Sequence, residues 1–298
     1  MTHSQKILVG FATYLGLIIL VVLLFGGWHR VQNNEFHPQN EFKLDTWFSI
    51  GPIHFNKAVL YLILAGLLTI GTVLWLTRRL KERPNRAQAG FEYLYTRVLK
   101  EMIMGDAMDE KMAAKWFPFI ATLFLFILFS NLLGYIPLPT NTEEKINIGI
   151  AHIPAFSLYA STANLSIPLV LAIVVFVSYT IEGVRAKGPG GYLKGLVPEG
   201  IHGFAAVPLF ILELFSNLMR LLSLSIRLFA NILAGHLIIL FMAGALAVLL
   251  GISAIGVITL PIGIVIYMFE VVLIAGLQAF IFATLTAIYL GGAVAESH

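Results

Sequence analysis

The sequence predicts an all-α integral membrane protein with four roughly perpendicular transmembrane helices and a C-terminal hairpin of two long, steeply tilted membrane helices. Composition points to a membrane protein, because 58% of the 298 residues are hydrophobic and only 12% are charged. A soluble domain has about twice that charged fraction. The mean hydropathy is +0.87, and the apolar residues are gathered into six runs. A helix of about 20 such residues crosses the hydrocarbon core of a bilayer.

Four runs have the length of a single perpendicular helix, at about 7–27, 57–77, 116–136 and 164–184. The first run is either a retained helix or a signal peptide. Its length, and the absence of a small-residue cleavage site after it, favour a retained helix. No internal repeat or low-complexity linker divides the chain, so we expect a single membrane domain over 1–298 with its core at 57–298.

Two longer apolar stretches follow, at about 208–250 and 257–292. A continuous helix over the first would be about 60 Å long at 1.5 Å per residue, which is twice what a perpendicular span needs. The connector 251–256 is nearly apolar as well. A steep tilt is the simplest way to fit helices of this length into a bilayer, so the two stretches are predicted to form an inclined hairpin.

The distribution of Lys and Arg predicts the orientation of the chain. Basic residues gather in the loops after the second and fourth runs, whereas the alternate connectors hold few of them. Cytoplasmic loops carry the excess of Lys and Arg in membrane proteins. Both termini are therefore predicted to be cytoplasmic, and the connectors 28–56 and 137–163 to be external.

A polar stripe follows one face of the fifth stretch. Its members recur every three or four residues, which is the period of one α-helical face: Glu213, Asn217, Arg220, Ser223, Arg227 and Asn231. Ionisable side chains at membrane depth are costly and usually mark an ion path or a pairing site. The stripe must therefore face water or a partner rather than lipid.

The last stretch carries Glu270 and Gln278 within an otherwise apolar helix, and His236 follows the stripe on the stretch before it. A His and a Glu on paired helices could pass protons through water, because burial and each other's charge move their pKa values toward neutrality. Arg227 cannot join such a relay, since arginine stays protonated. It would serve as a fixed positive charge facing a carboxylate on a moving partner.

Four segments carry a resemblance to a known family. The segment 225–236, Ser-Ile-Arg-Leu-Phe-Ala-Asn-Ile-Leu-Ala-Gly-His, resembles the signature of ATP synthase subunit a. The segment 277–282, Leu-Gln-Ala-Phe-Ile-Phe, is similar to the signature of that family's last helix. Two further matches are Phe-Ser-Asn-Leu-Leu-Gly-Tyr-Ile-Pro at 129–137 and Thr-Ala-Asn-Leu at 162–165. Together the matches cover roughly 50–298 in the order of the family.

The resemblance implies a proton-translocating stator subunit with two half-channels. Arg227 matches the family's essential arginine, which faces the carboxylate of the rotating c-ring and separates the half-channels. Four residues match polar positions of the half-channel that opens to the outside: Asn231, His236, Glu270 and Gln278. Glu213 matches an acidic position toward the cytoplasmic side, and Arg220 matches a basic position near it.

Two features of the match differ from the common family pattern. Many members carry an acid where this chain has His236, and a histidine near where it has Glu270, so the pair of side-chain types is kept. Glu270 precedes Gln278 by eight residues, one more than in the family. An extra residue rotates the Glu by about 100°, so either the helix holds a local bulge or Glu270 serves a shifted position.

The partners implied by the resemblance are c-ring subunits, peripheral-stalk b subunits, the F1 sector indirectly, and membrane lipid. A net charge of only +3 predicts no nucleic-acid partner. The chain lacks a G-x-x-x-x-G-K-[ST] phosphate loop, so we expect a non-catalytic subunit of a two-sector ATPase. It has no cysteine, and its histidines show no metal-ligand spacing, so no metal or cofactor is expected.

The implied location is a bacterial plasma membrane, with an organelle's inner membrane as the alternative. The choice between H⁺ and Na⁺ as coupling ion stays open, because much of it depends on the c subunit. Two other functions compete with this interpretation. A secondary transporter usually shows internal repeats, which this chain lacks. A non-conducting membrane scaffold gives no reason for a polar stripe of about five helical turns.

Overall fold

The computed structural model describes residue 16 and the ranges 42–51, 53–78, 86–105, 107–148, 151–197, 201, 206–242 and 253–295. Within these ranges, five helices are long and apolar enough to cross a membrane. The prediction of an all-α membrane protein is thereby confirmed. The expected first span, 7–27, lies outside the described residues except for residue 16.

Three helices correspond to the predicted single spans: α2 (Lys57–Arg78), α4 (Glu110–Gly134) and α5 (Ser166–Lys194). The long stretches correspond to α6 (Ala206–Leu240) and to the run α8 (Ser253–Phe269), η6 (Glu270–Ile274) and α9 (Ala275–Val294). The loop after α2 contains α3 (Arg86–Tyr93), which continues into the π-helix η2 (Leu94–Met104). A 3₁₀ turn, η3 (Ser161–Ala163), precedes α5.

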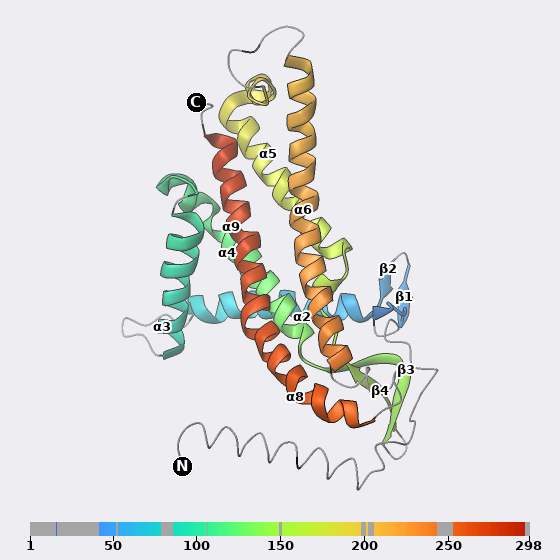
Figure 1. The fold of residues 1–298 in the computed structure, drawn as a ribbon. Helices are drawn as coiled ribbons and strands as arrows, with labels where there is room; N and C mark the ends of the chain where they lie inside the picture. The colour runs from blue at the N-terminus through green and yellow to red at the C-terminus, as the bar shows by residue number, and fades with distance from the viewer. Residues whose placement is uncertain are drawn as a thin grey trace. The chain divides into compact units, whose positions relative to one another are not determined.

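By their contacts the described residues form two units, one within 1–45, 138–158 and 234–273 and one within 46–137, 159–233 and 274–298. The larger unit holds α2, α4, α5, the first part of α6, and α9. Figure 1 shows α9 and this part of α6 running crosswise to α2. A crosswise course is what a steeply tilted helix beside a perpendicular span requires. The tilt in the membrane and the single-domain organisation stay predictions.

The core of the larger unit lies between α4 and α9. The α9 surface turned toward it carries alanines at every fourth position, all with 0% of their surface exposed: Ala275, Ala279, Ala283 and Ala287. Small residues let membrane helices approach closely. Ile120, Phe124 and Ile127 of α4 fill the same cluster, together with Leu228 of α6. Burial of this face therefore fixes which side of α9 points inward.

The helix α5 changes direction at Gly188, whose φ is +72°. Glycine adopts this left-handed conformation without the steric cost that other residues meet, and Pro189 follows it. The short segment after the kink returns the ring of Tyr192 to Gly183, where an added Cβ would overlap the ring. Lys187, directly before the kink, donates a hydrogen bond from Nζ to the carbonyl of Ala295 at 2.6 Å, which links α5 to the end of α9.

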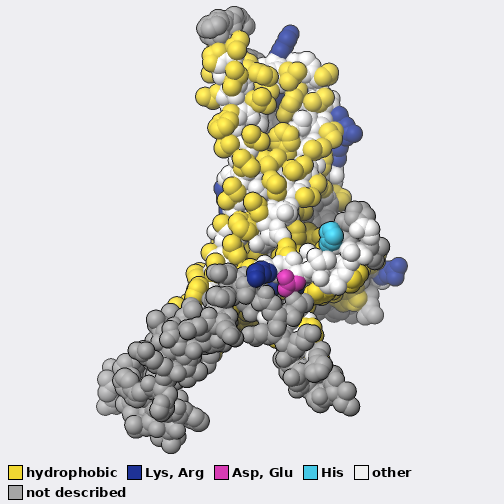
Figure 2. Space-filling view, turned by 90° about the vertical axis from the view of Figure 1, so that its right-hand side faces the viewer, with side chains coloured by type: hydrophobic (Ala, Val, Ile, Leu, Met, Phe, Trp, Pro, Cys, Tyr) yellow, Lys and Arg dark blue, Asp and Glu magenta, His cyan; other side chains and the backbone are white. Residues whose placement is uncertain are grey.

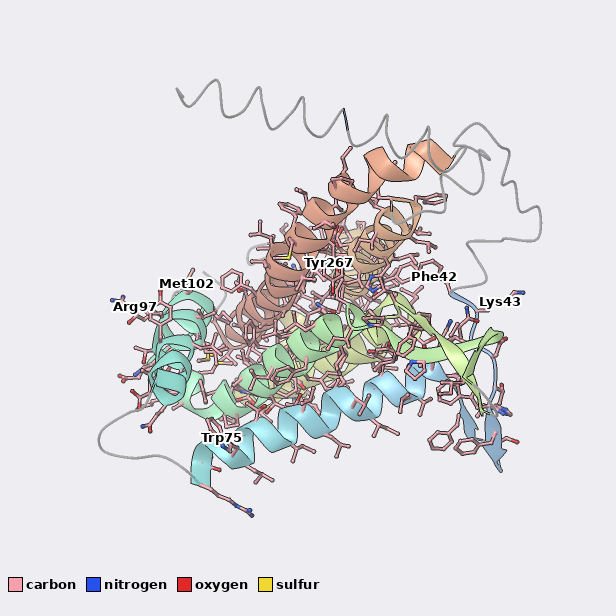
Figure 3. All side chains as sticks on the ribbon, turned by 90° about the horizontal axis from the view of Figure 1, so that it is seen from below. Phe42, Lys43, Trp75, Arg97, Met102 and Tyr267 are labelled. Carbon is pink, nitrogen blue, oxygen red and sulfur yellow. The ribbon has the colours of Figure 1, made fainter. Side chains whose placement is uncertain are left out.

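The helix η2 packs against α4 and α9 with its apolar face. Leu99, Ile103 and Met104 are buried, whereas Arg97 and Met102 project away from the neighbouring helices (Figure 3). A helix of this kind is suited to a boundary between apolar and polar surroundings.

Two small antiparallel hairpins are formed in the described ranges, which the helical prediction did not include. β1 (Phe48–Ile50) pairs with β2 (Ile53–Phe55) in the larger unit. β3 (Leu138–Ile148) pairs with β4 (Ala151–Ser157) in the smaller one. Both fall in the connectors predicted to be external. Outside the hydrocarbon core water satisfies the open edges of such strands, which lipid cannot do.

The smaller unit also contains the end of α6 and all of α8. An added Cβ on Gly263 of α8 would lie 3.1 Å from the Cβ of Met242, directly beyond α6. The two predicted long stretches therefore contact each other here. Their connector, 243–252, lies outside the described residues.

Candidate functional site

The N-terminal end of the predicted stripe forms a group of mutually bonded polar side chains on α6. Arg220 lies with Nη2 at 3.4 Å from Oε1 of Glu213 and with Nη1 at 3.4 Å from Oδ1 of Asn217. The guanidinium carbon of Arg220 also lies 6.0 Å from the ring centroid of Tyr289 on α9. Glu213 and Arg220, which the sequence predicted as neighbours, are thus brought together.

This group lines a cavity of about 530 Å³. Its walls come from α5, α6 and α9 of the larger unit and include Tyr179, Lys187, Tyr192, Glu213, Asn217, Arg220, Ile288 and Tyr289. A water molecule takes about 30 Å³ in the liquid, so the cavity has room for a chain of waters. The sequence analysis did not single out Tyr179 and Tyr289. In the sequence each of them is only a tyrosine inside an apolar run, and such tyrosines are also common in protein cores.

Two turns further along α6 the surroundings of the stripe are different. Arg227 and Asn231 are exposed, while Leu224, Leu228 and Ile232 beside them are buried in the core. Neither Arg227 nor Asn231 makes a hydrogen bond or ion pair with any residue that the structure describes. The helix therefore buries its apolar face and leaves a permanent cation on its outer face.

In the smaller unit, Glu270 lies against Gly235, the residue before His236. A Cβ added to Gly235 would overlap the Glu270 carboxyl group. His236 and Glu270 are both buried, with 2% and 8% of their surface exposed. Gly235 therefore provides the space that the Glu270 carboxyl occupies, one residue before His236 in the chain.

The spacing between Glu270 and Gln278 has a structural explanation. The π-helical turn η6 spans Glu270–Ile274 and α9 resumes at Ala275. A π-bulge takes up one extra residue within an α-helix, so this turn accommodates the one extra residue between Glu270 and Gln278. Of the two alternatives raised by the sequence, the structure contains the local bulge. Gln278 is buried, with 4% of its surface exposed.

Sequence reasoning gave no site role to Asn131 and Thr162, which form a buried polar pair. Asn131 donates from Nδ2 to the carbonyl of Ala275 at 3.1 Å. Thr162 donates from Oγ1 to Oδ1 of Asn131 at 2.8 Å. The available signal was an asparagine inside an apolar run and a threonine just before the next run. Among the described residues, no group of three or more His, Cys, Asp and Glu side chains could hold a metal ion.

Fold and site together define a multi-pass helical membrane protein that carries fixed and titratable charges along its membrane helices. The profile of the family described as ATP synthase A chain matches residues 59–291. The chain belongs to this family. Membership places it in ATP synthesis and proton transport, as a membrane subunit of a multi-subunit complex.

Similar proteins come from several bacteria and carry the description ATP synthase subunit a. The one from Hyphomonas neptunium is 32% identical over 88% of this chain and 97% of its own length. The one from Frankia alni is 35% identical over 86% of this chain and 84% of its own. The one from Gloeobacter violaceus is 36% identical over 85% and 89%.

Proposed function

We propose that this chain provides the two half-channels through which protons reach and leave the carboxylates of a rotating c-ring. A proton enters from outside and neutralises a ring carboxylate, the ring turns, and the carboxylate later releases its proton to the cytoplasm. Each proton that crosses 100 mV supplies about 2.3 kcal/mol, so several are needed for one ATP. The chain itself makes no ATP and belongs to the stator.

The observation that carries this proposal is the outer-face position of Arg227 without a partner in the described chain. A charge in a membrane helix is costly and is normally paired. An arginine left open on one face of α6 therefore fits a partner that supplies the counter-charge from another chain. A ring carboxylate facing Arg227 would be held ionised, because an adjacent positive charge favours the charged form of an acid. It would regain a proton only after leaving.

The external half-channel in this proposal uses Asn231, His236, Glu270 and Gln278. His236 and Glu270 are the titratable pair, and the proximity of the Glu270 carboxyl to Gly235 supports their cooperation. Imidazole and carboxyl groups exchange protons with water at accessible pH. Asn231 and Gln278 contribute hydrogen-bonding amides that orient water without adding charge.

The cytoplasmic half-channel uses the cavity between α5, α6 and α9, with Glu213 and Arg220 in its wall. Waters in this cavity would connect the ring carboxylate to the cytoplasm. Glu213 would accept the released proton transiently, and Arg220 would hold the Glu213 side chain toward the cavity through its ion pair.

The exposed side chains of the described residues are largely apolar, as expected for a surface that contacts lipid and other membrane subunits. Figure 2 shows hydrophobic side chains dominating the described part of one face, with Lys and Arg side chains at only a few places. Exposed apolar residues of α6 include Ile211, Phe215 and Ile226. We assign the face around Arg227 to the c-ring, other apolar faces to lipid and b subunits, and both termini to the cytoplasm of a bacterial cell.

The test is ATP-driven acidification of inverted membrane vesicles that carry Arg227→Ala, measured together with passive proton permeability. The matched control is Arg220→Ala, which removes the same charge two turns away. We expect loss of pumping and a raised leak for Arg227→Ala in an assembled complex, and substantial pumping for Arg220→Ala. Normal pumping by Arg227→Ala would refute the mechanism and leave the chain a scaffold.

A further inference from the structure

The buried pair of Asn131 and Thr162 lies where the π-helical turn η6 ends. Asn131, Thr162 and Ala275 each have 0% of their surface exposed. A buried amide without partners is strongly unfavourable, so the position of Asn131 is fixed by the groups that satisfy it. A carbonyl only accepts, so the Ala275 oxygen requires the amide nitrogen of Asn131. The Thr162 hydroxyl then donates to the remaining amide oxygen.

Ala275 is the first residue of α9 after the π-helical turn. Its carbonyl lies in the backbone hydrogen-bond ladder of α9 and also accepts the Asn131 bond at 3.1 Å. A side chain that enters the ladder in this way is a recognised cause of helix irregularity. Packing of the alanine face fixes which side of α9 points inward, and the Asn131 bond marks the residue at which the α-helical ladder resumes.

We propose that Asn131 and Thr162 are positioning residues that fix where α9 resumes after η6, and thereby fix the direction of the Glu270 side chain. This inference rests on the proposed function of Glu270 in the external half-channel. Without the pair, the turn relaxes and Glu270 rotates by about 100° about the helix axis. Its carboxyl then leaves the space beside Gly235. Asn131 and Thr162 act through the helix and need no contact with the proton.

The first experiment measures the direction of residue 270 without measuring proton transport. The chain has no cysteine, so Gly235→Cys and Glu270→Cys form the only thiol pair in it. Oxidation of the assembled complex in membranes, followed by peptide mapping, gives the rate of disulfide formation. We expect Thr162→Val, which keeps the shape of the side chain but removes the donor, to slow this rate about tenfold. Thr162→Ser keeps the donor and should cross-link as fast as the parent.

Equal rates for Thr162→Val and Thr162→Ser would overturn the proposal. This readout stays interpretable even if Arg227→Ala pumps normally, so failure of the inference and failure of the proposed function are separable.

The second experiment removes the need for the π-helical turn. Val272 is 67% exposed, and its deletion shortens the spacing from Glu270 to Gln278 by one residue, to that of the family. We expect Asn131→Leu alone to lower ATP-driven pumping about tenfold. In the Val272 deletion the same substitution should change pumping less than twofold, because a continuous α-helix needs no anchor there. An equal loss in both backgrounds would show that Asn131 supports packing and not the turn.

Discussion

The two arginines of α6 stand about two turns apart and have opposite surroundings. Arg220 is bonded to Glu213 and Asn217 and lies over the ring of Tyr289, whereas Arg227 makes no such contact in the described chain. The first charge is satisfied by its own subunit. The second is the charge that, in the proposed function, faces a carboxylate of another chain. The comparison shows that two arginines of one stripe can differ in the contacts that their own chain gives them, which neither residue type nor helical position reveals.

The largest difference in pumping between the two positions is expected when each arginine is replaced by lysine. Arg227→Lys keeps the charge but replaces a planar guanidinium by a compact ammonium, and we expect about a hundredfold loss of pumping, the scale of losing a preorganised charge contact. Arg220→Lys should keep most of the activity, because a lysine still supplies a positive charge to Glu213. Similar losses for the two variants in vesicle acidification would break the distinction.

A second prediction concerns the space beside Glu270. Gly235→Ala places a methyl group where the carboxyl lies, so Glu270 must move, and a displacement of about 1 Å can change rates by up to a hundredfold. We expect about a tenfold loss of pumping in vesicles. The control is Gly276→Ala, where an added Cβ meets nothing within 4 Å. If the control is as defective as Gly235→Ala, the loss reflects helix packing.

The sequence predicted the helices well where composition alone decides the outcome. The apolar runs gave α2, α4 and α5, and the three-to-four spacing placed Glu213 and Arg220 on one face, as the structure confirms. The extra residue before Gln278 could be noticed but not resolved, because a bulge and a shifted role have the same sequence. The partners of Asn131 could not be predicted, since they come from segments 31 and 144 positions away.

The different surroundings of Arg220 and Arg227 could not be predicted for the same reason, because they depend on segments far apart in the sequence. Both belong to one periodic stripe, and periodicity reports only the face of a helix. Whether a face meets a cavity or an outer surface depends on the helices that pack around it. Here α5 and α9 complete a cavity with Glu213 and Arg220 in its wall, whereas Arg227 has no hydrogen bond or ion pair with a described residue. The hairpin β3–β4 was likewise not predicted, because its pairing depends on contacts between two strands of a connector and not on a helical period.

A third, smaller effect is expected for Glu213. Glu213→Gln removes the proton acceptor from the cavity, and we expect pumping to fall roughly threefold, because waters still bridge the cavity past a neutral side chain. Stability should hardly change, since the Glu213–Arg220 pair is 33% and 44% exposed and such pairs contribute about 0.5 kcal/mol. Thermal unfolding separates the two readouts. A large drop in melting temperature with unchanged pumping would make the pair structural.

The smallest effect on transport is expected at Tyr159, a satisfied polar residue outside the membrane helices. Burial raises the pKa of Tyr159 from 10.0 to about 12, against the opposing effect of a hydrogen bond with Asn164. The Nζ of Lys57 lies 5.1 Å from the ring centroid. Because the folded pKa is raised, the contribution of Tyr159 to stability is complete below pH 10 and is lost as the pH rises toward 12.

Tyr159→Phe keeps the ring and removes the titrating hydroxyl, so it isolates this loss. Relative to the variant, the wild type should lose about 1.4 kcal/mol of unfolding free energy between pH 9 and pH 11, as measured by the difference in melting temperature at the two values. Pumping at neutral pH should be unchanged, because the hydroxyl is uncharged there and faces no proposed path. A parallel pH dependence of the two proteins would contradict the prediction. Reduced pumping by Tyr159→Phe would instead show that the external half-channel includes Tyr159, although this side chain already has partners within its own subunit.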